Sequence, residues 1–194
     1  SCYRGVRLAF VEMAKSGPYL DEFNQMALFR YNAYAGATEV GVLRVREVLP
    51  PRKLHWTRQL VEMRGIRKAA GAMARPMADG GPMPPPVIEH FNRRAALKYT
   101  ACADKEGWPA PQPVFSLFPS GPSALVFKAD EELLPGEGQA MAASSITHQL
   151  IAYQVKGKYR GRMNISGKIA DVLDVTHVYS AGPPLPCKSI YPAE

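Results

Sequence analysis

The sequence predicts an α+β protein, in which N-terminal helices and extended proline-rich segments precede a small β-α-β-α-β domain. The chain has 18 prolines and 16 glycines among 194 residues, and this composition favours long extended connections over one compact fold. Apolar residues recur at helical spacing in the first half of the chain, whereas short apolar runs near the C-terminus are typical of strands. The hydrophobic fraction of 46% is sufficient for a core.

The N-terminal region is predicted to hold two helices and one strand. Residues 3–16 place their apolar side chains on one helical stripe, which contains Val6, Ala9, Phe10 and Met13. Gly17 ends this helix and Pro18 begins a second, because proline suits the first helical turn. The run 39–49 is rich in valine and leucine, which favours a strand.

The middle of the chain alternates helices with proline-rich connections. Residues 53–74 predict a basic helix, whose apolar stripe contains Trp56, Leu60 and Met63. Residues 76–86 predict a linker of polyproline II and turns, and the next helix runs from Ile88 to near Gly107. Residues 108–122 form a second extended connection, which cannot bury its own large apolar side chains and is expected to dock them on a neighbour; these are Trp108, Phe115 and Phe118.

The C-terminal region is predicted to form one compact unit over 123–180. Its strands are expected at 124–129, 149–155 and 168–176, alternating with helices at 138–146 and 156–166. The apolar strand centres are expected in its core, namely Leu150, Ile151, Ile169 and Val172. The predicted organisation is thus a helical region 1–75, linkers around one helix at 76–122, this unit at 123–180 and an extended tail at 181–194.

Basic residues are concentrated between positions 52 and 75. Seven of them stand against Glu62 alone, and they are Arg52, Lys53, Arg58, Arg64, Arg67, Lys68 and Arg75. Seven minus one is +6, which is nearly the whole formal net charge of +7. Such a block steers acidic partners, namely nucleic acid, an anionic membrane surface or an acidic protein. A solvated helix face is the alternative.

No catalytic or metal-binding constellation is recognisable, so the chain is expected to be a soluble, non-catalytic assembly subunit. The four histidines do not pair at ligand spacing, and there is neither a nucleophile elbow nor a phosphate-binding loop of the Walker type. Cys2, Cys102 and Cys187 suggest no disulfide framework and point to a reducing compartment. No apolar run is long enough to span a membrane. The chain starts at Ser1, which is compatible with a mature form whose targeting segment was removed.

The C-terminal region resembles the small C-terminal domain of phycobilisome linker polypeptides. The resemblance is carried by three segments, Gln149-Leu150-Ile151-Ala152-Tyr153, Tyr159-Arg160-Gly161-Arg162-Met163 and Gly167-Lys168-Ile169. Ser166 replaces the first glycine of the family's Gly-Gly-Lys-Ile pattern, and Ala152 stands where a proline is usual. A weaker resemblance to the family's helical domain lies over 9–23. The two patches together cover less than half of the chain.

This resemblance implies a structural linker that organises phycobiliprotein rings in a light-harvesting antenna. The expected partners are phycobiliprotein subunits and other linkers, on the stromal face of the thylakoid in a chloroplast, with the chain an atypical linker of the red-algal kind. The residues expected to contact acidic partner surfaces are Arg52, Arg58, Arg64 and Arg67, with Trp56, Trp108 and Phe118 as anchors. No cofactor is required. A covalent bilin is an open alternative at Cys102, with Lys98 and Lys105 near enough to pair with its propionates.

Other functions remain open at this point. The chief alternative is an RNA-binding structural protein of an organellar ribosome or other ribonucleoprotein, because basic helices beside extended tails also suit phosphate contacts. A structural subunit of a respiratory or photosynthetic complex and an enzyme with an unrecognised site are further alternatives.

Overall fold

The chain forms two compact units, residues 1–54 and residues 55–194. The computed structural model describes residues 2–26, 37–53, 56–74, 80–148, 151–182 and 185–192. The boundary between the units, after residue 54, differs from the segment boundaries expected from the sequence, which lie after residues 75, 122 and 180. Within the described ranges, no helix has the length and apolar character needed to cross a bilayer.

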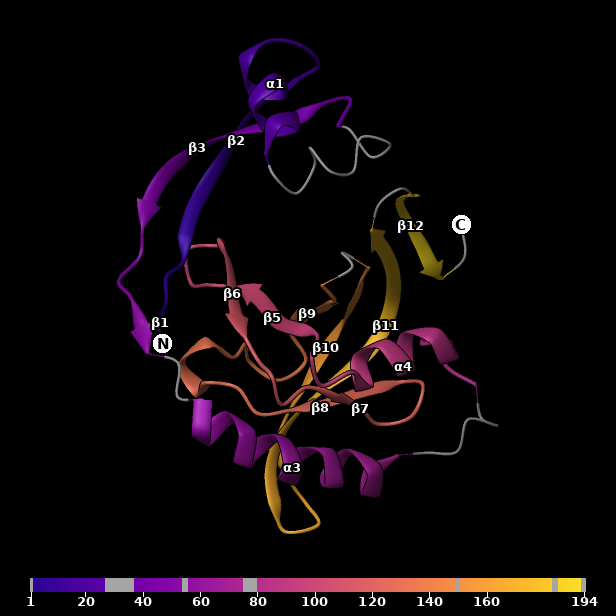
Figure 1. Ribbon diagram of the computed structural model, residues 1–194. Helices are drawn as coiled ribbons and strands as arrows, with labels where there is room; N and C mark the ends of the chain where they lie inside the picture. Colours follow the sequence, from indigo (N-terminus) through magenta and orange to yellow (C-terminus); the bar gives the residue numbers. More distant parts are fainter. Residues whose placement is uncertain are drawn as a thin grey trace. The chain divides into compact units, whose positions relative to one another are not determined.

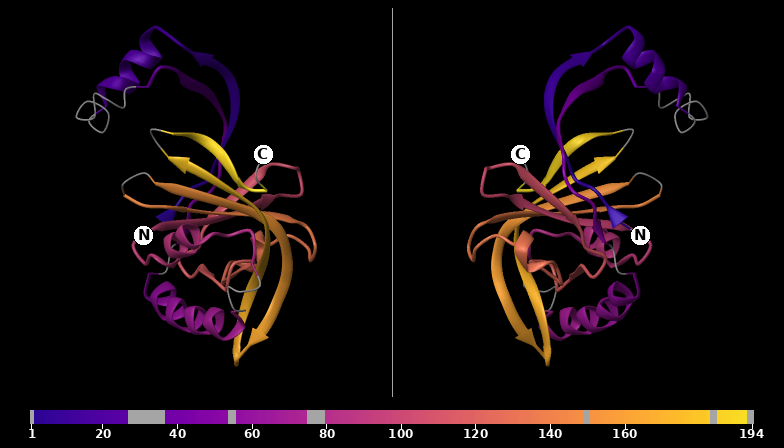
Figure 2. Two further views of the ribbon diagram at one scale, coloured as in Figure 1. Left: turned by 90° about the vertical axis from the view of Figure 1, so that its right-hand side faces the viewer. Right: turned by 90° about the vertical axis from the view of Figure 1, so that its left-hand side faces the viewer.

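The unit 1–54 is a long two-stranded ribbon (Figures 1 and 2). Strand β2 (Val6–Ala14) pairs antiparallel with β3 (Val40–Val48), and the short strands β1 (Cys2–Tyr3) and β4 (Arg52–Lys53) extend the same ribbon at its base. Helix α1 (Pro18–Gln25) follows β2 at the far end. The predictions of a helix beginning at Pro18 and of a strand over 39–49 are therefore confirmed.

The helix predicted over 3–16 is wrong, because most of this segment is strand β2. Val6, Leu8 and Phe10 alternate with Arg7 and Ala9, which is the two-residue period of a strand. The same segment also has apolar residues at helical spacing, so its pattern fits both a strand and a helix. The cross-strand partner decides between them. Each of these three side chains faces an apolar residue of β3, in the pairs Val6–Val48, Leu8–Val45 and Phe10–Leu43.

The unit 55–194 is built on an antiparallel eight-stranded sheet, coloured from pink to yellow in Figure 1. The strand order is β6-β5-β9-β10-β11-β8-β7, and β12 also pairs with β11. The strands are β5 (Leu97–Ala103), β6 (Pro109–Pro113), β7 (Phe118–Pro119), β8 (Ala124–Phe127), β9 (Ala140–Ile146), β10 (Ala152–Ile165), β11 (Lys168–Gly182) and β12 (Leu185–Tyr191). The helices are α3 (Trp56–Met73), α4 (Pro85–Asn92) and the short 3-10 helix η3 (Glu131–Leu133). Helix α3 confirms the basic helix expected over 53–74.

The predicted β-α-β-α-β order is wrong, because both of its helices are strands. The alanine-rich segment 138–146 forms β9, and 156–166 forms the second half of β10. In β9, Met141 and Ala143 are buried, whereas Ala142 and Ser144 are half-buried, so the period is two. Gly167, interpreted as a helix end, instead lies in the β10–β11 hairpin turn with a φ of 80°.

The helix predicted from Ile88 to Gly107 is correct only in its first turns. Helix α4 ends at Asn92, and β5 begins at Leu97. Lys98 and Thr100 point into the core while Tyr99 lies on the other face, which is a strand pattern. The proline-rich segment 108–122 is extended as predicted, and it supplies β6 and β7 to the sheet.

Strand β8 is apolar at every position because both faces of the sheet are covered there. Leu125 and Phe127 belong to the core under α4, and Ala124 and Val126 belong to the core under α3. The first core contains Met83, Val87, Phe91, Val114, Leu117, Val155, Leu173 and Val178 among others. The second contains Ile66, Ala69, Ala70, Phe118, Ile165, Ala170 and Val172.

The predicted core of the C-terminal region is correct only for Val172, which is completely buried. Ile151 is 42% exposed and Ile169 is 51% exposed, so both predictions are wrong. Ile169 stands beside the hairpin turn, at the end of β11 that pairs with β10 but projects beyond β8. Leu150 lies outside the described residues.

Candidate anion-binding site

One face of helix α3 is packed and the other is free to receive a ligand. Ile66, Ala69 and Ala70 lie in the core, and the Ser120 hydroxyl donates to the carbonyl oxygen of Ala70 at 2.9 Å. These contacts fix the rotation of the helix. The opposite face presents Thr57, Leu60, Val61, Arg64 and Arg67, at the three- and four-residue spacing of one helical stripe.

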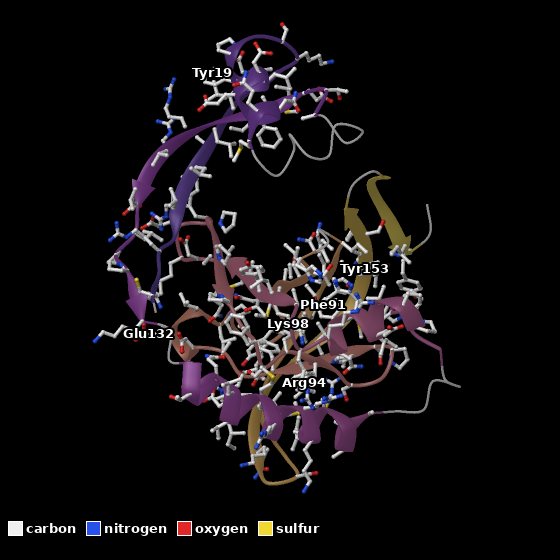
Figure 3. All side chains as sticks on the ribbon, in the orientation of Figure 1. Tyr19, Phe91, Arg94, Lys98, Glu132 and Tyr153 are labelled. Atoms are coloured by element: carbon white, nitrogen blue, oxygen red, sulfur yellow. The ribbon has the colours of Figure 1, made fainter. Side chains whose placement is uncertain are left out.

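This free face and Arg94 line a pocket of about 720 Å3. Its lining residues are Thr57, Leu60, Val61, Met63, Arg64, Arg67 and Arg94. Three arginines line it, and no carboxylate stands among its described lining residues. Figure 3 shows Arg94 beside α3. We call these residues the arginine pocket.

The arginines of the pocket are not neutralised by nearby acids. Within the described ranges, neither Arg64 nor Arg94 forms an ion pair or a hydrogen bond. Glu89 lies 3.7 Å from Arg93, so the carboxylate nearest in sequence pairs with the neighbour of Arg94. An anionic ligand would therefore meet unpaired cations, which is the arrangement that bidentate recognition of a carboxylate or phosphate requires.

Behind the pocket, Arg67 and Lys98 both lie over the ring of Phe118. The Arg67 guanidinium carbon is 6.0 Å and the Lys98 Nζ is 4.3 Å from the ring centroid. Lys98 Nζ also donates to the carbonyl oxygen of Leu117 at 2.8 Å. Burial, together with the charge of Arg67, lowers the pKa of Lys98 to about 7.

Arg94 is positioned by α4, which is held tightly against the sheet. Val87 and Phe91 are completely buried, and His90 Nε2 hydrogen-bonds the carbonyl oxygen of Ser145 at 3.1 Å. The ring of His90 meets that of Tyr153 edge to face at 4.9 Å. Burial lowers the pKa of His90, so the imidazole is neutral at neutral pH.

Sequence reasoning identified two of the three pocket arginines. Arg64 and Arg67 were expected to contact a partner, but Arg94 was missed because it lies beyond the basic stretch and joins it only through the packing of α4. Phe118 is 1% exposed and supports the pocket from the core instead of facing a partner. The pattern that could have found Arg94 is the pair of adjacent arginines, Arg93-Arg94, at a helix end.

The other predicted partner residues do not join the pocket. Arg52 is exposed on β4 of the unit 1–54. Trp108 is half-buried at the β5–β6 turn, where its backbone N–H donates to Asp104 Oδ1 at 2.9 Å. The side chains of Trp56 and Arg58 lie outside the described part of the structure.

Cys102 stands on β5 instead of a helix, beside an apolar depression of about 290 Å3. Its Sγ donates to the carbonyl oxygen of Leu133 at 3.3 Å. Burial, with the charge of Asp104, raises the pKa of the thiol, which disfavours the thiolate that covalent attachment needs. Lys98 is buried and turned away to Leu117, so it is not available to a propionate. A bilin at Cys102 stays a prediction of the sequence resemblance.

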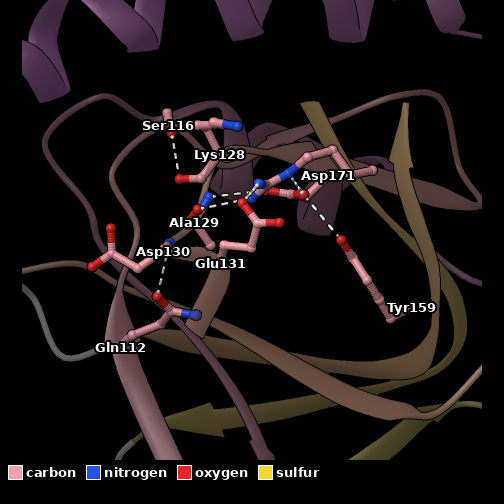
Figure 4. A network of polar contacts seen from close by, with 9 residues as sticks. Gln112, Ser116, Lys128, Ala129, Asp130, Glu131, Tyr159 and Asp171 are labelled. Atoms are coloured by element: carbon pink, nitrogen blue, oxygen red, sulfur yellow. Dashed lines mark hydrogen bonds and ion pairs between the residues drawn. The ribbon is translucent and has the colours of Figure 1, made fainter. Parts of the chain in front are cut away.

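A second polar cluster, drawn in Figure 4, is structural because its charges are internally satisfied. Asp171 is completely buried and accepts hydrogen bonds from Tyr159 at 3.0 Å, Arg162 Nε at 2.8 Å and the Ala129 N–H at 3.1 Å. Arg162 also pairs with Glu131 at 2.7 Å. Burial and the Asp171 carboxylate raise the pKa of Tyr159. The network ties η3 to the sheet.

Among the described residues, no group of three or more His, Cys, Asp or Glu side chains is placed to hold a metal ion. Cys2 and Cys102 are free thiols. The features of the described chain that point to a ligand are therefore the charge and shape of the arginine pocket.

Comparison with known proteins gives distant structural likenesses. No protein-family model matches the chain, and no curated protein matches it. HupZ of Group A Streptococcus is similar in structure at 12% identity and a TM-score of 0.42, over 52% of this chain and 95% of that one. A NimC/NimA family protein of Clostridium acetobutylicum is similar at 10% identity and a TM-score of 0.39, over 70% and 98%. At these values neither likeness bears on function.

Proposed function

We propose that the chain is a binding protein whose arginine pocket receives a carboxylate of an acidic protein partner. The observation that carries the proposal is that Arg64, Arg67 and Arg94 line one concavity with no acid among its described lining residues. A guanidinium presents a planar fork of donors that matches a carboxylate in two parallel hydrogen bonds. No step of chemistry is assigned to the site.

The apolar wall of the pocket favours a protein partner over RNA. Leu60 is 57% exposed and Val61 is 74% exposed, so a ligand also covers aliphatic surface beside the charges. Acidic protein segments supply aliphatic side chains next to carboxylates. Single-stranded nucleic acid instead needs aromatic side chains on which its bases stack, and none stands among the lining residues that the structure describes.

The finer functions expected from the sequence stay predictions. The light-harvesting linker, its phycobiliprotein partners and its chloroplast location rest on a resemblance whose helix over 156–166 is wrong. The ribonucleoprotein alternative rests on the basic stretch, of which Arg52 belongs to the other unit. The proposal of an acidic partner depends on neither.

Binding of a labelled peptide of alternating Glu and Leu residues, followed by fluorescence anisotropy with the full chain, tests the proposal. We expect Arg64→Gln and Arg94→Gln each to weaken binding about tenfold or more, since a charge-assisted hydrogen bond is worth roughly 1.5–3 kcal/mol. Arg64→Lys should weaken binding less than Arg64→Gln does, because lysine keeps the positive charge but lacks the two parallel donors of the guanidinium. Binding should also weaken with added salt.

The double variant Arg52→Gln/Lys53→Gln is the matched control, because it removes two charges of the same basic stretch outside the pocket. It should bind the peptide as the wild type does. Equal loss in this control, or no binding of the peptide by the wild type, would overturn the proposal. Tighter binding of a single-stranded RNA, lost in the pocket variants, would establish the alternative instead.

A further inference from the structure

The β2–β3 ribbon has one entirely apolar face. Its members are Val6, Leu8, Phe10, Met13, Leu43, Val45 and Val48. Gly41 completes the row opposite Met13, where a side chain would meet Met13 and Phe10 at 3.7 and 3.9 Å. The other face mixes charged and apolar residues, in the pairs Arg7–Glu47, Ala9–Arg44, Glu12–Val42 and Ala14–Val40, and Arg7 and Glu47 form an ion pair at 2.9 Å. We call the apolar side the ribbon face.

All seven side chains of the ribbon face are between 41% and 62% exposed. An isolated two-stranded ribbon is at best marginally stable in water, since it has no second layer to bury its apolar side chains. The largest apolar patch of an ordinary monomer is on the order of 300–600 Å2, and seven half-exposed large side chains reach that range or exceed it. A face of this composition needs a cover.

Among the described residues, the two ends of the ribbon carry opposite net charges, since Lys15 and Glu39 at the far end pair with each other at 3.9 Å. At the base, Arg4, Arg52 and Lys53 are exposed; at the far end, Asp21 and Glu22 of α1 are exposed. None of these five side chains has an ion-pair partner within the described ranges. The ribbon is therefore an apolar surface between a basic end and an acidic end.

We propose that the ribbon face packs against the ribbon face of a second copy of this chain, with the two ribbons antiparallel. In this arrangement, two-fold symmetry places the basic end of each ribbon against the acidic end of the other. Two identical chains are then complementary in charge. Two such patches together bury on the order of 1,000 Å2, which is the lower limit for a specific interface. A parallel arrangement would set like charges together. The proposal is independent of the arginine pocket.

Sedimentation equilibrium of the full chain tests the pairing directly. We expect a dimer at micromolar concentration and a monomer for Phe10→Asp, because a carboxylate at the centre of the ribbon face cannot be buried unpaired. Arg44→Asp introduces the same residue on the opposite face, next to the partner of Phe10, and should leave the dimer intact. Equal loss of the dimer in the control would contradict the ribbon face as the interface.

Charge exchange tests the antiparallel arrangement without touching the apolar residues. Asp21→Lys/Glu22→Lys should weaken the dimer about tenfold or more at low salt, and adding Arg52→Glu/Lys53→Glu in the same chain should restore it. Weakening without restoration would overturn the antiparallel order. A wild type that stays monomeric while β2 and β3 are protected from hydrogen exchange would show that another segment of the chain covers the face, and a monomer with unprotected strands would show that nothing does.

Discussion

The ribbon of residues 1–54 and the sheet of residues 55–194 differ in what covers their apolar strands. In β8, Leu125 and Val126 point to opposite faces and both are completely buried, because a helix or another strand segment lies on each side. In β2, Phe10 is 62% exposed. Apolar residues in a strand therefore do not form a core by themselves. In residues 55–194 other elements of the same unit cover the apolar strand residues, whereas the apolar face of the ribbon stays half-exposed.

The largest effect on this comparison is expected from Asp171 in the sheet. Asp171→Ala removes the acceptor of Arg162 and Tyr159 and leaves the guanidinium partly buried, which should lower the free energy of unfolding by about 3–5 kcal/mol. Urea denaturation followed by circular dichroism measures it. Asp174→Ala breaks the exposed pair with Arg160 and should cost less than about 1 kcal/mol. Equal costs would mean that the Asp171 network is not buried.

Two leucine truncations compare the units more closely. Leu173→Ala in the sheet should cost about 2–5 kcal/mol, because Leu173 is completely buried. Leu43→Ala in the ribbon should leave the unfolding of residues 55–194 unchanged but weaken the dimer. Ile169→Ala, half-exposed on β11, should cost less than about 1 kcal/mol. A large loss for Ile169→Ala would show that the hairpin end is covered.

The sheet should also respond to pH through Lys98. Its pKa is about 7 in the folded chain, against 10.5 for an ordinary lysine. Between these values the unfolded chain binds the proton and the folded chain does not, so the unfolding free energy should rise with pH, by about 2 kcal/mol from pH 7 to pH 9. Lys98→Met should remove this rise. A rise that persists in Lys98→Met would assign it to another group.

The sequence pattern correctly predicted those elements whose composition and period favour a single type of secondary structure. The strand at 40–48, the basic helix α3 and the apolar run of β8 were all recognisable from composition and period. Pattern failed where helix and strand periods both fit, as in β2, or where alanine favours a helix but its neighbours form a sheet, as in β9. Non-local pairing decides these cases, and it acts between residues far apart in the chain.

The candidate site was predictable in part for the same reason. Arg64 and Arg67 share a helix stripe that the sequence displays. Arg94 joins them only because Phe91 and Val87 anchor α4 in the core, and a buried Phe118 could not be told from an exposed one in a proline-rich segment.

Hydrogen exchange of the full chain at a series of concentrations tests the central claim most directly. If the sheet covers itself and the ribbon needs a second copy, amides of β8, β10 and β11 should be protected equally at every concentration. Amides of β2 and β3 should gain protection as the concentration passes the dissociation constant of the dimer. Protection of β2 and β3 that is strong and independent of concentration would contradict the account.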